Sequence, residues 1–344
     1  MIEIDGSYLE GGGQILRTSL ALAAITQKPC RVYNIRAKRK NPGLRTQHLQ
    51  GVRAIAKLCD AKVKGDFLGS TEIAFHPGEL KGGRIGIQIS TAGSVGLVFQ
   101  VLSLPACFCE RDVEIAVKGG ATYGKFAPPV DYINLVLLPL LEKMGYRAKI
   151  DVLKHGFYPK GGAEVRMEIK RVGELKPLCM EERGEIKRIG GISLASKDLQ
   201  RARVAERQVE GAESVLRGYE GETEIKTGYV NSLCPGSGLT LCAECENSFL
   251  GSDSLGERGK RAEEVGREAG EELASALASG ACLDEHAADQ ILPFLALASG
   301  ESEVTAEQIT AHCRTNMWVI EKFLPVKFEV REGKERAKVI CKKI

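Results

Sequence analysis

Three glycines lie beside a carboxylate near the start of the chain, in the segment Glu10-Gly11-Gly12-Gly13-Gln14-Ile15-Leu16-Arg17. Glycine lets a backbone approach a ligand closely, and the free N–H groups at a helix start attract phosphate. Glu10 has a carboxylate that could hold a metal ion, and Arg17 has a guanidinium that could bind an anion. A turn or two of helix separates the two residues. An ion pair between these two residues at the helix end is the alternative.

The densest positive charge of the chain follows in a loop that runs from Arg36 to His48. Residues 31–57 contain eight Lys and Arg and no acidic residue. We predict that the loop joins a strand to a helix N-terminus, where loops bind ligands in α/β folds. The charge indicates either a phosphate-binding surface or an ordinary solvated face.

A single histidine, His312, lies at the expected start of another helix. Aligning Val319–Lys322 with Ala54–Lys57 places His312 opposite Gln47, so the histidine and the basic loop would occupy equivalent helix starts. A neutral imidazole is a nucleophile. A lone histidine is more often structural, and the same holds for the other histidines, which are His48, His76, His155 and His286.

The segment Gly119–Lys125 matches the first part of a P-loop, G-x-x-x-x-G-K. Phe126 comes next and cannot bind magnesium, and Pro128 and Pro129 block the helix that should follow. We therefore reject a P-loop.

Cys242 and Cys245 form a C-x-x-C pair, with Cys234 nearby. A closed zinc site needs four ligands, and no second pair has suitable spacing. The segment also alternates as a strand does, which would send the two thiols to opposite faces. We interpret them as ordinary thiols.

The order of predicted elements repeats in residues 16–63, in residues 97–150 and after Ala288. The predicted helices are Leu16–Ile25, Thr46–Leu58, Leu97–Cys107, Val130–Met144, Asp289–Ala298 and Cys313–Phe323. The predicted strands are Cys30–Ile35, Val113–Val117, one from Tyr146, Val326–Val330 and Ala337–Cys341. This pattern predicts an α/β fold of stacked sheet-and-helix modules, formed by residues 1–179 and 285–344.

Residues 180–284 are predicted to form a smaller inserted α/β domain with strands and helices of its own. Residues 180–285 contain 21 Asp and Glu against 13 Lys and Arg, a net charge of −8, whereas the whole chain carries +3. The predicted strands are Ile186–Ala195, Glu222–Tyr229 and Leu239–Cys245, and the helices are Leu199–Arg217 and Leu255–Ala278. The acidity opposes a primary RNA surface. We expect that deleting the insertion spares the chemistry of the remaining chain if that chain still folds.

Eleven scattered cysteines, an odd number, accompany an N-terminus that does not resemble a signal peptide. We expect reduced thiols and a cytoplasmic protein. No apolar run is long enough to span a bilayer, so we expect no membrane partner.

Motifs along essentially the whole chain resemble the RNA 3′-terminal phosphate cyclase family. They are residues 5–17, Asn41–Leu44, Gln47-His48, Ser94–Gln100, His286–Gln290, Thr315-Asn316 and Phe323–Val326. The family signature His/Arg-Gly-x-x-Pro-x-Gly-Gly-Gly-x-aliphatic corresponds to His155–Val165, with Ala163 in place of the third glycine. That departure questions any role that needs a positive φ at this position.

The resemblance implies three repeats of two helices on a four-stranded sheet, plus a smaller inserted domain. It also implies an ATP-dependent reaction in which His312 forms a covalent histidine–AMP. AMP then passes to an RNA 3′-terminal phosphate, and the neighbouring 2′-hydroxyl expels it to leave a 2′,3′-cyclic phosphodiester.

The resemblance also implies roles for particular residues. Glu10 would hold Mg²⁺ or Mn²⁺. The ATP site would comprise Gln100, His286, Ala287, Ala288, Asp289 and Gln290. Phosphates and RNA would contact Arg17, Arg36, Arg39, Gln47 and His48. Asp289 would orient groups near the histidine or the metal, and a helix N-cap is its alternative role.

Two other classes of protein share features with this pattern. A cyclase-like ribosome-assembly factor has the fold without the nucleophilic histidine, and an enolpyruvyl transferase repeats similar modules without activating a histidine with ATP. His312 favours the cyclase. The expected partners are ATP and an RNA with a 3′-terminal phosphate, and a homodimer is possible.

Overall fold

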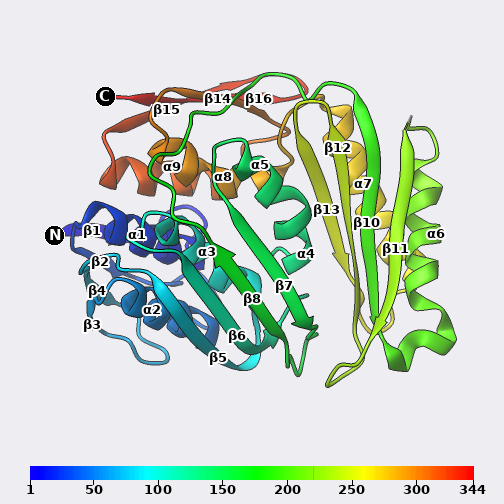
Figure 1. The fold of residues 1–344 in the computed structure, drawn as a ribbon, viewed down its shortest axis with the longest axis horizontal. Helices are drawn as coiled ribbons and strands as arrows, with labels where there is room; N and C mark the ends of the chain where they lie inside the picture. Colours follow the sequence, from blue (N-terminus) through cyan, green and yellow to red (C-terminus); the bar gives the residue numbers. More distant parts are fainter. Residues whose placement is uncertain (220) are drawn as a thin grey trace.

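Three segments of the chain fold into the same βαβαββ unit (Figure 1). The computed structural model describes residues 1–219 and 221–344. The first repeat consists of β1 (Ile2–Asp5), α1 (Gly13–Thr26), β2 (Cys30–Tyr33), α2 (Thr46–Leu58), β3 (Lys62–Lys64) and β4 (Ile73–His76). Its sheet has the order β1-β2-β4-β3, in which only the first pair is parallel.

The second repeat has the same topology with longer strands, in the sheet order β5-β6-β8-β7. Its elements are β5 (Gly83–Ser94), α3 (Val95–Ala106), β6 (Val113–Ala121), α4 (Val130–Tyr132), a π-helical turn Ile133–Leu137, α5 (Leu138–Glu142), β7 (Ala148–Lys154) and β8 (Glu164–Ile169). The predicted helix Val130–Met144 is therefore interrupted by a π turn.

The third repeat is divided by the insertion. Its first strand, β9 (Cys179–Met180), precedes the inserted residues, and the other elements follow them. These are α8 (Glu285–Leu297), β14 (Ser302–Ala306), α9 (Ala311–Phe323), β15 (Val326–Glu332) and β16 (Ala337–Lys343), in the sheet order β15-β16-β14-β9. The predicted fold of three repeats is thus confirmed.

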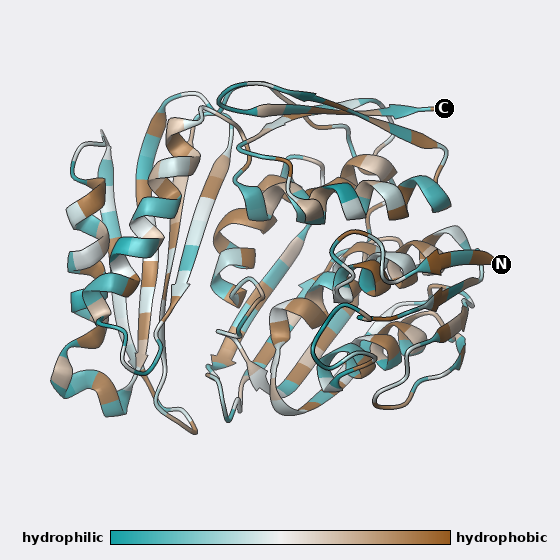
Figure 2. Cartoon of the chain, turned by 180° about the vertical axis from the view of Figure 1, so that it is seen from behind, coloured by the Kyte–Doolittle hydropathy of each residue, from teal (hydrophilic) through white to brown (hydrophobic). Residues whose placement is uncertain are grey.

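The inserted residues form a fourth sheet with a different order, β11-β10-β12-β13. Its elements are β10 (Ile186–Ser196), a 3₁₀ turn Lys197–Ala202, α6 (Val204–Leu216), β11 (Glu222–Val230), β12 (Ser237–Cys245), β13 (Phe249–Leu255) and α7 (Ala262–Ala278). In Figure 2, hydrophobic segments mark the strands of this sheet, and hydrophilic segments recur along α7. That residues 180–284 fold as a domain on their own stays a prediction.

Helices at the centre of the molecule explain why the repeats stay together. The first helices α1 and α3 pack on each other, and α1 also packs on α9. Leu20–Ala24 of α1 are almost fully buried, as expected of a helix enclosed on most sides. One continuous hydrophobic core therefore runs through all three repeats.

Three of the predicted helices begin at least four residues away from the predicted start. Leu255 ends a strand, and α7 starts only at Ala262, because the charged segment between them forms a turn. The helix predicted from Leu199 starts as a 3₁₀ turn, and the one predicted from Asp289 already starts at Glu285.

The thiols and the glycine-rich segments behave as the sequence suggested. Cys242 packs in the main core and Cys245 in the core of the insertion, so they lie on opposite faces of β12. All eleven cysteines are free, and ten of them are buried.

Ala163 is fully buried without a positive φ, whereas Gly161 and Gly162 have φ of 71° and 90°. None of the helices formed by the described residues is both long and apolar enough to cross a membrane.

One buried carboxylate, Asp284, joins the insertion to two of the repeats. Its side chain caps α8 by accepting hydrogen bonds from the N–H groups of His286 and Ala287, at 3.0 and 2.9 Å. It also accepts the Tyr132 hydroxyl at 2.6 Å and the Gly251 N–H at 2.8 Å. Asp284 is the last residue of the predicted insertion, so deleting residues 180–284 would remove this carboxylate together with the Gly251 donor. Whether the remaining chain folds without them decides whether its chemistry is spared.

We expect Asp284→Ala to lower the free energy of unfolding by about 3 kcal/mol or more, because it removes a helix cap and leaves buried donors unpaired. Urea unfolding monitored by circular dichroism measures the change. Asp112→Ala, which removes an exposed carboxylate bonded to Lys170 and Arg171, serves as the control and should lose at most about 1 kcal/mol. Equal losses in the two variants would contradict the role of Asp284 in joining the insertion to the repeats.

Candidate active site

The loop between β1 and α1 brings the N-terminal glycines against the start of α2. Gly11 has φ +57°, and Gly12 is the N-cap of α1. A Cβ at Gly13 would lie 2.4 Å from Nε2 of His48. A side chain at Gly13 would therefore displace His48, which explains a glycine at the first residue of the helix.

Three side chains from the first and third repeats form a hydrogen-bonded chain that ends at His312. The Nε2 of Gln14, on α1, donates to Oδ2 of Asp289 at 3.0 Å. The Oε1 of the same amide lies 2.7 Å from Nδ1 of His312, on α9. Asp289 is the fifth residue of α8 and Asp284 is its N-cap, so the N-cap interpretation of Asp289 is wrong.

This chain selects one tautomer of the imidazole. An ionised carboxylate only accepts hydrogen bonds, so Asp289 requires the NH₂ group of Gln14 and turns the amide oxygen toward His312. That oxygen in turn requires a proton on Nδ1. The lone pair of His312 is therefore on Nε2, which makes Nε2 the nucleophilic nitrogen.

Burial and nearby cations keep His312 neutral. Desolvation lowers the pKa of His312 below its ordinary value of 6.5, and the charges of Arg17 and Arg39 lower it further, while Glu10 opposes them. Asp289 behaves in the opposite way, because burial raises its pKa to about 7. Asp289 therefore begins to gain a proton at a higher pH than His312 does.

Two guanidiniums lie near the histidine. Arg17 donates through Nε to Oε1 of Gln100 at 2.8 Å, and burial lowers the pKa of Arg17 to about 10, so it stays charged at neutral pH. Arg39, in the basic loop, pairs with Glu10 at 2.9 Å. The partner of Glu10 is therefore Arg39, and the alternative ion pair between Glu10 and Arg17 is not formed.

Glu10 fits the requirements of a divalent ion bound together with phosphates. Its side chain is about one-third exposed and belongs to the same charged environment as His312. Mg²⁺ commonly takes one or two protein carboxylates and completes its shell with water and substrate phosphates. When bound, such an ion would be held by Glu10.

The other residues predicted to bind phosphates make hydrogen bonds that fix the basic loop and the start of α2. Arg36 donates to the carbonyl oxygens of Asn41 and Gly43 at 2.7 and 2.9 Å. Gln47 accepts from the N–H of Ser94 at 3.2 Å, and His48 accepts from the N–H of Arg45 at 3.3 Å. Burial and the charges of three arginines lower the pKa of His48 to about 3, so this imidazole is neutral.

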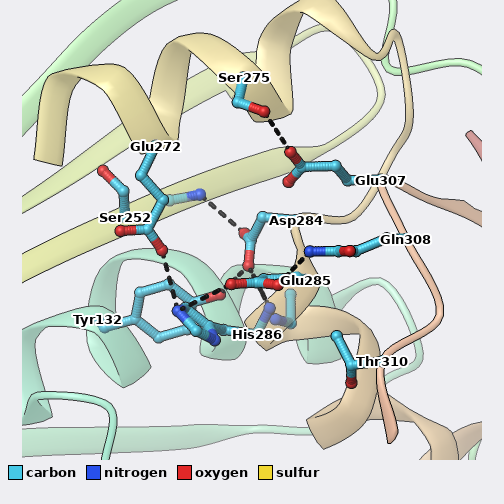
Figure 3. Close-up of polar contacts among 12 residues, drawn as sticks. Tyr132, Ser252, Glu272, Ser275, Asp284, Glu285, His286, Glu307, Gln308 and Thr310 are labelled. Carbon is cyan, nitrogen blue, oxygen red and sulfur yellow. Dashed lines mark hydrogen bonds and ion pairs between the residues drawn. The ribbon is translucent and has the colours of Figure 1, made fainter. Parts of the chain in front are cut away.

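The side chain of His286, in the first turn of α8, lies toward Glu272 of the insertion (Figure 3). The Nε2 of His286 lies 2.9 Å from Glu272 of α7 and 3.9 Å from Glu285. Desolvation lowers the pKa of His286, but the hydrogen bond to Glu272 and the charge of Asp284 outweigh it and raise the pKa to about 10.

Glu272, Glu285 and His286 form the only group of side chains among the described residues whose spacing could hold a metal ion. The nearby carboxylates raise the pKa of His286, and its Nε2 lies 2.9 Å from Glu272, so we interpret the group as an ion pair between α8 and α7. Ala287, Ala288 and Gln290 are buried within α8, where Gln290 donates to the carbonyl oxygen of His286 at 3.0 Å.

Comparisons with known proteins agree with this arrangement. A family model described as RNA 3′-terminal phosphate cyclase matches residues 8–330. Proteins named RNA 3′-terminal phosphate cyclase from Methanopyrus kandleri and Pyrococcus furiosus are 48% and 49% identical, over 97% of this chain and 96% of each relative. One from Archaeoglobus fulgidus is 46% identical over 96% of this chain and 98% of its own. The chain belongs to the RNA 3′-terminal phosphate cyclase family.

For this member of the cyclase family, sequence reasoning missed residues that orient the candidate nucleophile. Gln14 lay within the quoted motif but received no role. Asn316 donates to the carbonyl oxygen of Asp289 and accepts from Thr18, both at 2.7 Å, so it ties α9 to α8 and α1. The available signal was a polar side chain on an otherwise buried helix face, which usually has a specific partner.

We expect Gln14→Met to change the tautomer of His312, because methionine fills a similar volume but accepts no strong hydrogen bond. Imidazole ¹⁵N chemical shifts measure this, with His312→Ala used for assignment. Nε2 should be unprotonated in the parent protein and largely protonated in the variant. Gln50→Met, the same change on α2 instead of α1, is the control. Identical His312 shifts in the parent protein, Gln14→Met and Gln50→Met would contradict the role of Gln14.

Proposed function

We propose that this protein uses ATP to convert the 3′-terminal phosphate of an RNA into a 2′,3′-cyclic phosphodiester, with His312 as nucleophile. The observation that carries the proposal is the chain from Asp289 through Gln14 to His312, which leaves Nε2 unprotonated beside two guanidiniums. A neutral nitrogen nucleophile beside fixed positive charge suits attack on a phosphorus atom.

In the first step, the lone pair of His312 Nε2 attacks the α-phosphorus of ATP. The bond from that phosphorus to the bridging oxygen breaks, and pyrophosphate leaves with the electron pair. The proton on Nδ1 stays in its hydrogen bond with Gln14, which stabilises the positive charge that develops on the ring. Arg17 and Arg39 would offset the charge of the phosphates, and a divalent ion at Glu10 would neutralise more of it.

In the second step, an oxygen of the RNA 3′-phosphate attacks the phosphorus of the histidine adenylate and displaces Nε2. In the third, the 2′-hydroxyl oxygen attacks the RNA phosphorus, AMP leaves, and the hydroxyl proton is released to solvent. The basic loop near Arg39 and Gln47 is the phosphate surface available for the RNA end.

No observation favours a function as a non-catalytic assembly factor. Such a protein has no use for an oriented imidazole, whereas the hydrogen bonds of Gln14 and Asn316 here connect the helix of His312 to the first repeat and to α8. Membership of the cyclase family decides against an enolpyruvyl transferase.

Incubating the protein with α-labelled ATP and a divalent ion should give an acid-labile protein–AMP adduct. The adduct should disappear in His312→Ala and persist in His76→Ala, which replaces an exposed histidine on β4. Labelled protein recovered on a denaturing gel is the measurement. If the parent protein forms no adduct, the proposed function is wrong.

The rate of adenylation should fall as the pH drops through about 7, the pKa of Asp289. A protonated carboxyl can donate as well as accept, so it no longer fixes the amide of Gln14. His312 titrates below 6.5, so its own protonation comes later.

An asparagine amide donates as well as accepts at every pH, so Asp289→Asn should behave like the protonated carboxyl: adenylation should be slower at pH 8, and the fall near pH 7 should disappear. Only the fall below 6.5 that comes from His312 should remain. Single-turnover labelling across the pH range measures both profiles. Profiles that coincide would show that Asp289 does not control the acid side.

A further inference from the structure

A cavity of about 720 Å³ lies between the second repeat and the insertion, and none of its lining residues belongs to the site around His312. One wall consists of Tyr123 and Lys125, after β6, and of the turn Phe157–Pro159. The other wall comes from the insertion, mainly from the segment 255–262 that joins β13 to α7. A cavity of this size can hold a ligand as large as a nucleotide.

Positive charge gathers in this cavity although the insertion is acidic as a whole. Its described lining contains one carboxylate, Glu257, and five cations, which are Lys125, Arg207, Arg258, Lys260 and Arg261. Three of the cations also have partners behind the lining, because Arg207 and Arg261 pair with Glu263 and Lys260 pairs with Glu268. Arg258 is exposed and has no ion-pair partner among the described residues. Lys125 and Glu257 pair at 2.8 Å but are both well exposed, so a phosphate could replace the carboxylate at little cost.

Exposed aromatic rings accompany these cations. Tyr158 is 56% exposed, and the ammonium of Lys125 lies 5.4 Å from its ring centre. Phe126, the neighbour of Lys125, is 99% exposed and has φ +58°, a backbone region that bulky residues rarely adopt. Cations beside exposed rings are the usual means of binding single-stranded nucleic acid, because bases stack on the rings.

A short series of contacts connects the cavity with the candidate active site. Gln47 accepts from the N–H of Ser94 at 3.2 Å. Gly124 packs against the same serine, so closely that a Cβ there would lie 3.1 Å from the Cβ of Ser94. Lys125 is the next residue and lines the cavity. Only Ser94 and Gly124 separate Gln47 from Lys125 along this series, so the cavity lies close to the start of α2.

We propose that this cavity, with Lys125, Tyr158 and Arg258, binds the RNA strand upstream of its reacting 3′ end. The proposal rests on the proposed cyclase function and adds a second contact region for the same substrate. Phosphates of the strand meet the cations, and a base stacks on Tyr158.

The test compares an RNA of about 16 nucleotides with a dinucleotide, called the short RNA, both with a 3′-terminal phosphate, because a dinucleotide has almost no strand upstream of its reacting end. The variants are Lys125→Gln/Arg258→Gln, Tyr158→Ala, and the control Arg217→Gln/Arg267→Gln, which neutralises two exposed cations of the insertion outside the cavity. Fluorescence anisotropy gives Kd at several salt concentrations, and labelled ATP reports adenylation of each variant.

For the longer RNA, we expect Tyr158→Ala to raise Kd by about tenfold and to leave its salt dependence unchanged. The double variant Lys125→Gln/Arg258→Gln should also raise Kd, and it should flatten the plot of log K against log salt by about 1.4. The short RNA, adenylation and the control should be unaffected.

An unchanged Kd for the longer RNA in both cavity variants would overturn the proposal, even if the parent protein adenylates and cyclises normally. Equal losses for the two RNAs would also overturn it, since the short RNA has almost no strand upstream of its reacting end. Failure of the parent protein to form an adduct would instead count against the proposed function, so the two failures are distinguishable.

Discussion

The four hydrogen bonds to the Asp284 carboxylate fix the helix on which the candidate site depends. Tyr132 and Gly251 hold the carboxylate from the second repeat and from the insertion, and the carboxylate in turn fixes the first turn of α8. Asp289 lies little more than a turn further along the same helix. Asp289 orients Gln14, and Gln14 orients His312. A shift of α8 would therefore change the orientation of the His312 imidazole through these two hydrogen bonds.

The repeated fold supplies equivalent positions with different chemistry. The second residue of the second helix is Gln47 in the first repeat, Asp131 in the second and His312 in the third. Gln47 holds the backbone of Ser94, and Asp131 accepts the hydroxyl of Tyr123 at 2.7 Å, next to the cavity. One scaffold thus presents three helix starts, and only the third carries a histidine, the candidate nucleophile. Polar groups on α1 and α8 then reach this nucleophile because the helices of the repeats meet at the centre of the molecule.

Local sequence was sufficient to predict the long amphipathic helices and the alignment of Gln47 with His312. The helix Thr46–Leu58, for instance, has the predicted bounds, because its apolar spacing and its flanking loop are both clear. The first strand of each repeat was not predicted. β9 has only two residues, and β5 contains glycines and polar residues that weaken its pattern. Such strands form because a partner is already in place, which local sequence does not show.

The candidate site was predictable in its residue types and not in its contacts. Glu10 and Arg17 could be selected because they flank a glycine-rich turn, and His312 because it lies at a helix start equivalent to that of Gln47. The bond between Gln14 and His312 joins residues 298 positions apart, and the orientation of the amide depends on a third residue on another helix. No spacing rule encodes such a contact, since it arises only when the three repeats pack.

The net charge of the insertion gave a misleading impression of its surfaces. Its carboxylates serve partly as internal partners, as Glu272 does for His286 and Glu263 for Arg207. Within the segment 255–262, Lys260 pairs with Glu268 and Arg261 with Glu263, so Arg258 is the cation of this described segment that stands beside the cavity without an ion-pair partner. A net charge of −8 therefore coexists with a basic wall, because screening limits the reach of exposed charges to about 10 Å and a ligand meets only the side chains nearest to it. The insertion thus combines two roles that its composition hides: it holds α8 through Gly251 and Glu272, and it forms one side of a cavity suited to an anionic strand.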